Sequence, residues 1–372
     1  AHAGQPVRFT TAGATCFAPG VRLGHFTAAY TTPYRPKQSG ELVFSMQLQG
    51  WMSLYVNGKQ VFHGGNMKSA KAHSIMVDAG KDYQIRCVYQ ATEGDCESFN
   101  FELGFERPLD LDKTLALVSD ADVIVFAGGI SPQLEGEEMP VKIKGFSGGD
   151  RDIIELPDIQ TRMLRRLKTL GKPIVMVNYS GSAMALTEES QLCDAVLQAW
   201  YPGQAGGEAV AETLLGDNNP AGRLPVTFYA STSGLPDFED YSMSRRTYRY
   251  FHGKPLYPFG HGLSYSTFRY GKARLDNNKA SAKQAITIII PVENTGRIDG
   301  DEVVQVYLQR IGDNQGPTHA LRGFRRVNIA ANSTRKVDIT LTPEQLQWFD
   351  TATNTMRVLP GRYALLYGPS SD

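Results

Sequence analysis

Apolar runs that alternate with helical periods fill the middle of this 372-residue sequence, from about Leu111 to Leu224. ADVIVFAGG and PIVMVNYSG have the continuous apolar character of buried strands. Between them, LPDIQTRMLRRLKTLGK repeats apolar residues at helical spacing and has Gly171 just past the helix end. Strands that alternate with helices form βαβ units, in which neighbouring strands run parallel. The middle of the chain is therefore predicted to form an α/β domain with a mostly parallel sheet.

Short runs that alternate between polar and apolar residues precede and follow this region. LVFSMQLQ and SLYVNGKQVF, with the hairpin dipeptide Asn57-Gly58, predict a β-sandwich before it. AITIIIPVENTG, EVVQVYLQR and GRYALLYG predict a second, immunoglobulin-like sandwich after it. A Pro/Tyr/Gly-rich stretch from 223 to 270 has neither period and is interpreted as a long structured connection. We predict domains at 1–106, 107–270 and 271–372, and the weak pattern at the start of the first domain suggests that an earlier piece is missing.

The composition argues against several classes of function. The 38 basic and 38 acidic residues give a formal net charge of +0, so no global field attracts the chain to nucleic acid or to an anionic membrane surface. The longest apolar run, around ITIIIPV, is far shorter than the ~20 residues of a membrane-spanning helix. The cysteines have no CxxC spacing, and no His or Cys pair has metal spacing, so neither a metal nor a cofactor is predicted. Cys87 and Cys96 remain open as a disulfide pair or as free thiols.

Three glutamates stand out in the run GISPQLEGEEM, directly after the strand pattern ADVIVFAGG. Glu135, Glu137 and Glu138 place three carboxyls within four positions. Open α/β sheets keep their ligand sites at the carboxyl ends of parallel strands, which is where this run lies. Like charges at such spacing repel, so at least one carboxyl of the cluster is expected to have a raised pKa. A general acid needs such a group, although a solvated acidic loop would show the same local pattern.

The residues that follow the cluster favour a general acid over a solvated acidic loop. GFSGGDRDIIELPDIQ comes within ten residues and contains the pair Gly148-Gly149, which predicts a turn. Asp150 and Arg151 can make a charge-assisted contact that fixes this turn. Simple bracing of the loop would use the same pair, so the local sequence alone does not separate the two roles.

Several linked motifs resemble the C-terminal half of glycoside hydrolase family 3. They are, in chain order, GISPQLEGEEM with GGDRDIIELPDIQ, then KPIVMVNYSGS, AWYPGQAGGEAVAETLLGDNNPAGRLPVTFY, RRTYRYFHGKPLYPFGHGLSYSTFRY and VENTGRIDGDEVVQVYL. The resemblance covers 107–372 and implies an α/β sandwich domain followed by a fibronectin type III-like domain. Residues 1–106, with SGELVFSMQLQGWMSLYVNGKQVF, resemble the protective-antigen-like β-sandwich that some members insert in or beside the α/β domain.

Members of this kind are retaining exo-β-glycosidases, and the resemblance implies that the loop after ADVIVFAGG carries their acid/base glutamate. In similar members this residue stands in patterns such as E-x-E-G, which assigns the role to Glu137 here. Glu138 occupies the position of the expected glycine, and the Asp150-Arg151 pair lies further downstream than in the family. Glu135 is therefore kept as the reserve candidate and Glu138 as a weaker one.

The resemblance also implies a second carboxyl that this sequence does not show. The nucleophilic aspartate of the family lies on an N-terminal (β/α)8 barrel, and neither that barrel nor the opening strand of the α/β sandwich is recognisable here. A retaining mechanism needs both carboxyls, so we expect the chain to be inactive alone and to need a barrel domain or chain as its partner. The implied substrates are oligosaccharides or aryl β-glycosides with terminal β-xylosyl or β-glucosyl residues. The implied location is secreted or periplasmic.

A non-catalytic carbohydrate-binding or scaffolding chain is the alternative function. It would need neither a nucleophile nor a barrel. Trp51 and Tyr55 could stack a saccharide at the edge of the first sandwich, although a core position is the favoured interpretation of the tryptophan. Without a barrel the α/β domain would lack a large apolar neighbour, so we expect the isolated chain to self-associate, and a homo-oligomer stays open.

Overall fold

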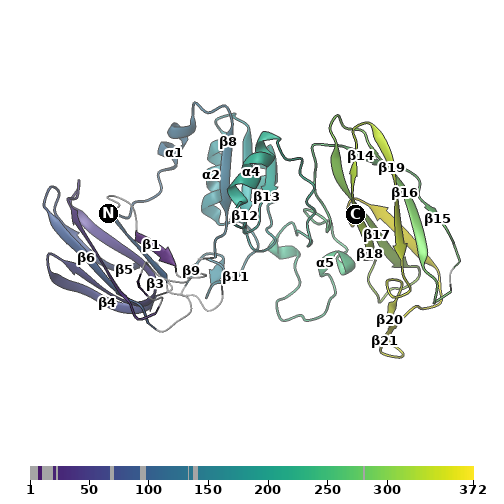
Figure 1. Cartoon of the computed structure of the whole chain (residues 1–372), viewed down its shortest axis with the longest axis horizontal. Coiled ribbons are helices and arrows are strands. Elements are labelled where there is room, and N and C mark those ends of the chain that lie inside the picture. The colour runs from purple at the N-terminus through teal and green to yellow at the C-terminus, as the bar shows by residue number, and fades with distance from the viewer. Residues whose placement is uncertain are drawn as a thin grey trace. The chain divides into compact units, whose positions relative to one another are not determined.

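The computed structural model describes residues 7–10, 20–21, 24–67, 71–92, 98–132, 134–136, 141–279 and 281–372 (Figure 1). The chain divides into two compact units. The first consists of Ala1–Thr114 and Gln133–Arg151, and the second of Leu115–Pro132 and Asp152–Asp372. Most of the loop that carries the glutamates thus belongs to the first unit, although the strand before it belongs to the second.

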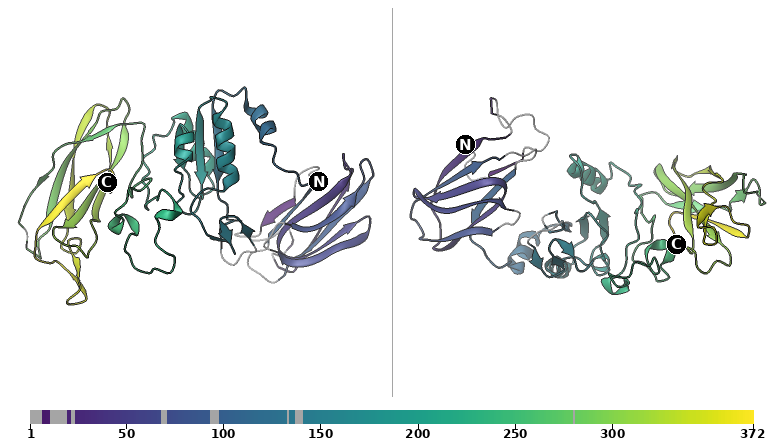
Figure 2. Two further views of the ribbon diagram at one scale, coloured as in Figure 1. Left: turned by 180° about the vertical axis from the view of Figure 1, so that it is seen from behind. Right: turned by 90° about the horizontal axis from the view of Figure 1, so that it is seen from below.

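Antiparallel strands make up most of the first unit, and they are the purple and blue arrows in Figure 2. Their bounds are β1 (Val7–Thr10), β2 (Thr27–Tyr34), β3 (Gly40–Val56), β4 (Lys59–Met67), β5 (Lys71–Val77), β6 (Tyr83–Gln90) and β7 (Ser98–Gly104). The long strand β3 pairs with β5 and β7 through its first half and with β4 and β6 through its second half. Asn57 (φ 50°) and Gly58 (φ 79°) form the turn from β3 to β4, so the hairpin predicted from this dipeptide is confirmed.

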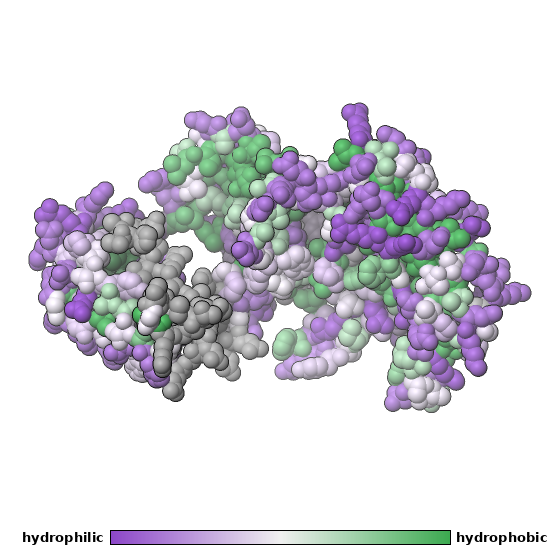
Figure 3. All heavy atoms as spheres, in the orientation of Figure 1, coloured by the Kyte–Doolittle hydropathy of each residue, from purple (hydrophilic) through white to green (hydrophobic). Residues whose placement is uncertain are grey.

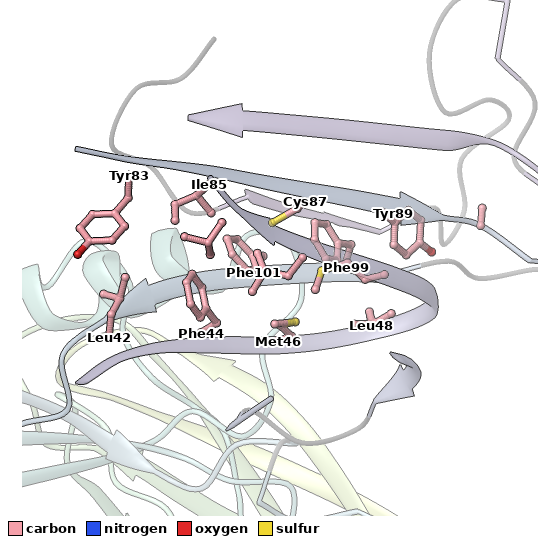
Figure 4. Packing of buried hydrophobic residues seen from close by; sticks show 14 of the residues in the cluster. Leu42, Phe44, Met46, Leu48, Tyr83, Ile85, Cys87, Tyr89, Phe99 and Phe101 are labelled. Atoms are coloured by element: carbon pink, nitrogen blue, oxygen red, sulfur yellow. The ribbon is translucent and has the colours of Figure 1, made fainter. Parts of the chain in front are cut away.

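One face of β3 fills the core of this unit. Leu42, Phe44, Met46 and Leu48 alternate along the strand and are at most 1% exposed. They pack against side chains of β6 and β7, which are Tyr83, Ile85, Cys87, Tyr89, Phe99 and Phe101 (Figure 4). Removing this much apolar surface from water is the main term that stabilises such a sheet. Cys87 is a buried free thiol in this core, and Cys96 lies outside the described residues.

Three parallel strands form the sheet of the second unit, in the order β13-β12-β8. The elements are β8 (Ile124–Gly129), α2 (Asp158–Lys168), β12 (Ile174–Tyr179), α3 (Glu189–Leu192), β13 (Ala195–Gln198) and α4 (Gly206–Leu215), and α1 (Leu111–Val118) lies at the unit boundary. Figures 1 and 2 show α2 beside the sheet, and its apolar side buries Leu164 (0% exposed) and Leu167 (4%). The predicted helix and the predicted parallel sheet are both confirmed.

The outer strand β8 exposes apolar side chains. Val123 just before it and Val125 within it are 51% and 53% exposed, and Leu117 of α1 is 79% exposed. Figure 3 shows hydrophobic side chains gathered over this end of the α/β part. A strand of a parallel sheet is ordinarily covered on both faces, so this edge differs from the usual arrangement.

A second β-sandwich ends the chain. One sheet contains β14 (Phe268–Tyr270), β15 (Arg274–Leu275), β16 (Ile286–Asn294) and β19 (Ser333–Leu341), and the other contains β17 (Gly300–Arg310), β18 (Ala320–Ile329) and β22 (Tyr363–Gly368). A small hairpin of β20 (Trp348–Asp350) and β21 (Thr355–Arg357) is added. Ile290, Val292, Val304 and Val306 meet in the core and are all 0% exposed. The second sandwich predicted from alternation is therefore confirmed.

The connection between the α/β part and this sandwich contains two short helical elements. They are η1 (Thr232–Gly234) and α5 (Thr247–Tyr250). Within the described parts of the chain, none of the helices has the length and apolar character needed to cross a membrane.

Candidate active site

The glutamate-bearing loop begins at the end of β8, which is held in place by hydrogen bonds to α2 and to β12. The N–H of Gly129, the last residue of β8, donates to Oε1 of Gln160 (2.8 Å), and Nε2 of that amide donates to the carbonyl of Gly129 (2.6 Å). The N–H of Ile130 donates to the carbonyl of Tyr179 at the end of β12 (2.8 Å). Gly129 has φ +124°, and a Cβ there would lie 1.9 Å from the carbonyl oxygen of Tyr179, so only glycine fits.

The loop also ends at a braced position. The carboxylate of Glu155 accepts hydrogen bonds from the N–H (2.8 Å) and the hydroxyl (2.5 Å) of Thr232 in η1. The N–H of Ile154 donates to the same hydroxyl oxygen (2.9 Å). Burial opposes the charged form of Glu155, but the hydrogen bonds from Thr232 outweigh it and lower the pKa of this carboxyl. Glu155 therefore serves as an ionised brace at the end of the loop.

Inside the loop, three two-residue strands form a small antiparallel sheet. They are β9 (Lys142–Ile143), β10 (Phe146–Ser147) and β11 (Asp150–Arg151), in the order β11-β10-β9. The turn between β10 and β11 uses the predicted glycine pair, and both Gly148 (φ 64°) and Gly149 (φ 92°) have left-handed backbone. The buried ring of Phe146, 4% exposed, anchors the sheet.

Glu135 is held by an ion pair across this loop. Its Oε1 lies 3.8 Å from Nη1 of Arg151, and the two side chains are 23% and 9% exposed. The N–H of Gly136 donates to the carbonyl of Gly149 (3.1 Å), which joins the same two parts of the loop. Arg151 therefore braces the loop through Glu135. The other two candidates, Glu137 and Glu138, lie outside the described residues.

Sequence reasoning missed the two contacts that fix the ends of the loop. Gln160 lies in the first turn of α2, and the helical period predicts the helix but gives no sign that the Gln160 amide bonds to Gly129. Glu155 and Thr232 are 77 residues apart, so no local pattern connects them. The two contacts fix Gly129, at the end of β8, and Glu155, just ahead of α2.

The amide of Gln160 gives a direct test of this geometry. Gln160→Ala would leave the Gly129 N–H without its partner, at a cost of ~1–3 kcal/mol. We expect amide hydrogen exchange at Gly129 to become about 5- to 150-fold faster, since exchange follows the free energy of local opening. Arg162→Ala, an exposed position of the same helix, is the matched control. Equal exchange rates in Gln160→Ala and the parent protein would contradict the assigned role.

The fold and this loop define a multidomain chain that combines an α/β domain, with acidic residues at a strand end, and a C-terminal β-sandwich. The family model described as the glycosyl hydrolase family 3 C-terminal domain matches residues 31–265, and that of the fibronectin type III-like domain matches residues 302–371. The chain belongs to glycoside hydrolase family 3.

Named relatives of the chain are β-xylosidases and β-glucosidases. A xylan 1,4-beta-xylosidase of Xylanibacter ruminicola is 45% identical over 99% of this chain and 42% of its own length. A periplasmic beta-glucosidase of Salmonella typhimurium is 31% identical over 70% of this chain and 34% of its own length. The chain thus spans well under half the length of these relatives.

A solved structure shares the arrangement of elements. The crystal structure of a Kluyveromyces marxianus beta-glucosidase in complex with glucose is similar with a TM-score of 0.74 at 25% identity, over 98% of this chain and 45% of that one. The domain boundaries at 106 and 270 stay a prediction, since the matched family region runs from within the first sandwich to the connection.

Proposed function

We propose that this chain is the C-terminal part of a retaining exo-β-glycosidase and that it supplies the acid/base glutamate from the loop after β8. The observation that carries this proposal is the position of that loop. In a family 3 chain, it leaves the carboxyl end of a parallel strand and is fixed at Gly129 and at Glu155. Such anchoring is what a proton donor needs in order to meet a leaving oxygen in a fixed geometry.

Glu137 is the proposed acid/base residue, with Glu135 in reserve and Glu138 as the weaker alternative. The ion pair of Glu135 with the mostly buried Arg151 supports this order, because a carboxylate held by a guanidinium serves to brace the loop. The family pattern supports it independently, since it assigns the role to the position of Glu137.

The nucleophile is proposed to come from a (β/α)8 barrel, as a domain or as a separate chain. A retaining mechanism places its two carboxyls about 5–5.5 Å apart, one to attack the anomeric carbon and one to protonate the leaving oxygen. The named xylosidase is more than twice the length that this chain covers. The exposed Val123 and Val125 at the edge of β8 also fit an α/β part that has a further neighbour.

The proposed substrates are plant-derived oligosaccharides with non-reducing-end β-xylosyl or β-glucosyl residues. The 45% identity to a named xylosidase favours xylose over glucose. Secretion or a periplasmic location is proposed with it, supported by the periplasmic relative.

The test of this function is the stereochemistry of the first product. The complete enzyme is given an aryl β-xyloside and an aryl β-glucoside, and the anomeric proton of the released sugar is followed by NMR before mutarotation. The β-anomer should appear first. Inversion, or failure to hydrolyse either glycoside, would contradict the proposal.

Exposed aromatic surface on the first sandwich supports saccharide binding as a second role. Trp51 is 44% exposed, so the interpretation of it as a core residue is wrong. The alternation of β3 directs Met52 and Leu54 inward and Trp51 outward. Its ring stacks on His63 (5.4 Å between centroids, 21° between planes) and lies over Gly65, where a Cβ would come within 2.7 Å of it. A flat ring held in this way can pack on the apolar face of a sugar.

Trp51→Ala is expected to weaken retention of the chain on immobilised xylan without changing the hydrolysis of aryl glycosides by the complete enzyme. Affinity electrophoresis in gels with and without soluble xylan measures the retention. Met76→Ala, at another exposed apolar residue of the same sandwich, is the control. Retention equal to that of the parent chain would exclude this face as the binding site.

A further inference from the structure

The short helix α5 packs on the beginning of strand β18, and Figure 1 shows the two side by side. The N–H and the hydroxyl of Thr318 donate to the carbonyl of Arg249 (2.8 and 3.0 Å). The N–H of Leu321 donates to the phenolic oxygen of Tyr248 (3.0 Å). The connection and the second sandwich are thus joined by specific bonds at this place.

Two half-buried arginines lie at this junction, one from each side. The guanidinium of Arg249 in α5 lies over the ring of Tyr250, 5.6 Å from its centroid. The guanidinium of Arg322 in β18 lies over the ring of Trp348, 5.5 Å from its centroid. Nη2 of Arg322 also donates to the carbonyl of Gln347 (2.8 Å). An arginine over an aromatic ring can still donate hydrogen bonds in the plane of its guanidinium.

Neither arginine has an acidic partner among the described residues. Both Nε atoms are buried and have no hydrogen-bond partner there, and no carboxylate lies within 4.0 Å of either guanidinium. Burial, and then the positive charge of Arg249, lower the pKa of Arg322. Two positive charges in a partly buried site cost free energy unless an anion neutralises them.

The carboxylate that contacts the ring of Trp348 already has partners. Asp313 accepts hydrogen bonds from Nε1 of Trp348 (2.8 Å) and from the N–H of Gly316 (2.8 Å), and it pairs with Arg310 at 3.5 Å. It holds the ring on which Arg322 stacks. Asp313 therefore does not neutralise the two arginines.

We propose that Arg249 and Arg322 form a binding site for a carboxylate, at the junction of α5 and β18. Planar guanidinium edges match a planar carboxylate through paired hydrogen bonds. The carboxylate comes either from an acidic side chain in the part of the enzyme outside this chain or from a free acid such as a uronic acid. The site is independent of the proposed acid/base glutamate, and its test does not use catalysis.

Arginine Nε–H signals in NMR spectra of the chain provide the test. Sodium acetate should shift the Nε–H signals of Arg249 and Arg322 in a saturable way, and neutral acetamide should not. Arg249→Gln should remove the response of Arg322, whereas Arg297→Gln, at an exposed arginine of the same sandwich, should leave it intact. Signals that do not move with acetate, or that move more with phosphate than with acetate at equal ionic strength, would overturn the proposal.

Thermal unfolding with and without acetate distinguishes the two sources of the carboxylate, a side chain of the enzyme and a free acid. A saturating ligand should raise the unfolding midpoint of the chain by about 2–4 °C. If acetate stabilises the chain and not the complete enzyme, a side chain of the enzyme already fills the site. If it stabilises both, the site takes a free acid. If it stabilises neither, or stabilises Arg249→Gln and Arg322→Gln as much as the parent, the proposal fails.

Discussion

Replacement of Glu137 by glutamine in the complete enzyme is expected to lower kcat/KM for xylobiose by about 10²- to 10⁴-fold, the range that a positioned proton donor contributes. Glutamine keeps the size of the side chain and removes the transferable proton. The loss should be much smaller for an aryl β-xyloside whose phenol is acidic, because that leaving group departs without protonation. Steady-state kinetics over a series of phenols measures the difference.

Matched variants separate this role from a structural one. Glu135→Gln should weaken the contact with Arg151 and affect all substrates alike, since it acts through the loop. Glu138→Gln should have the smallest effect. Thermal unfolding of each variant checks that the fold is kept. A dependence on the leaving group that appears in Glu135→Gln and not in Glu137→Gln would move the acid/base role to Glu135.

Arg223→Met is expected to destabilise the second unit by about 3–5 kcal/mol, because it leaves a buried carboxylate without its partner. Nη2 of Arg223 donates to both carboxylate oxygens of Glu302 (3.1 Å each), and the two side chains are 8% and 3% exposed. This ion pair joins the connection after α4 to strand β17. A loss of this size is a large fraction of the stability of an ordinary domain. Urea unfolding of the chain measures it.

The double variant Arg223→Met/Glu302→Leu is the control for this explanation. Removing both charges should recover much of the loss, because no charge is then left buried. Glu302→Leu alone should be as harmful as Arg223→Met alone. A loss below about 1 kcal/mol in both single variants would place this pair in the class of weak surface ion pairs.

Local patterns in the sequence predicted the elements well. The period of LPDIQTRMLRRLKTLGK predicted α2, and the continuous apolar run PIVMVNYSG predicted β12. The Asn57-Gly58 dipeptide predicted the hairpin from β3 to β4. Each of these signals lies within a few residues of the structure that it specifies, so no tertiary information was needed.

Contacts between residues far apart in the chain could not be predicted from the sequence. Arg223 and Glu302 are 79 residues apart, and each looks like an ordinary charged residue in its own segment. Trp51 was misplaced because an aromatic residue in an alternating strand is ordinarily assigned to the core, whereas the register of β3 turns it outward. Which residues share a face or a buried ion pair depends on register and packing, which a single sequence leaves undetermined.

The proposed role of the loop after β8 is tested most directly by the product that Glu137→Ala forms in the presence of azide. In a retaining mechanism, water needs a base to attack the glycosyl-enzyme, whereas the azide anion does not. The complete enzyme that carries this variant should hydrolyse an activated aryl β-xyloside slowly, should be accelerated by azide, and should release β-xylosyl azide. Absence of acceleration, or formation of the α-azide, would contradict the assignment of Glu137 as the acid/base of a retaining glycosidase.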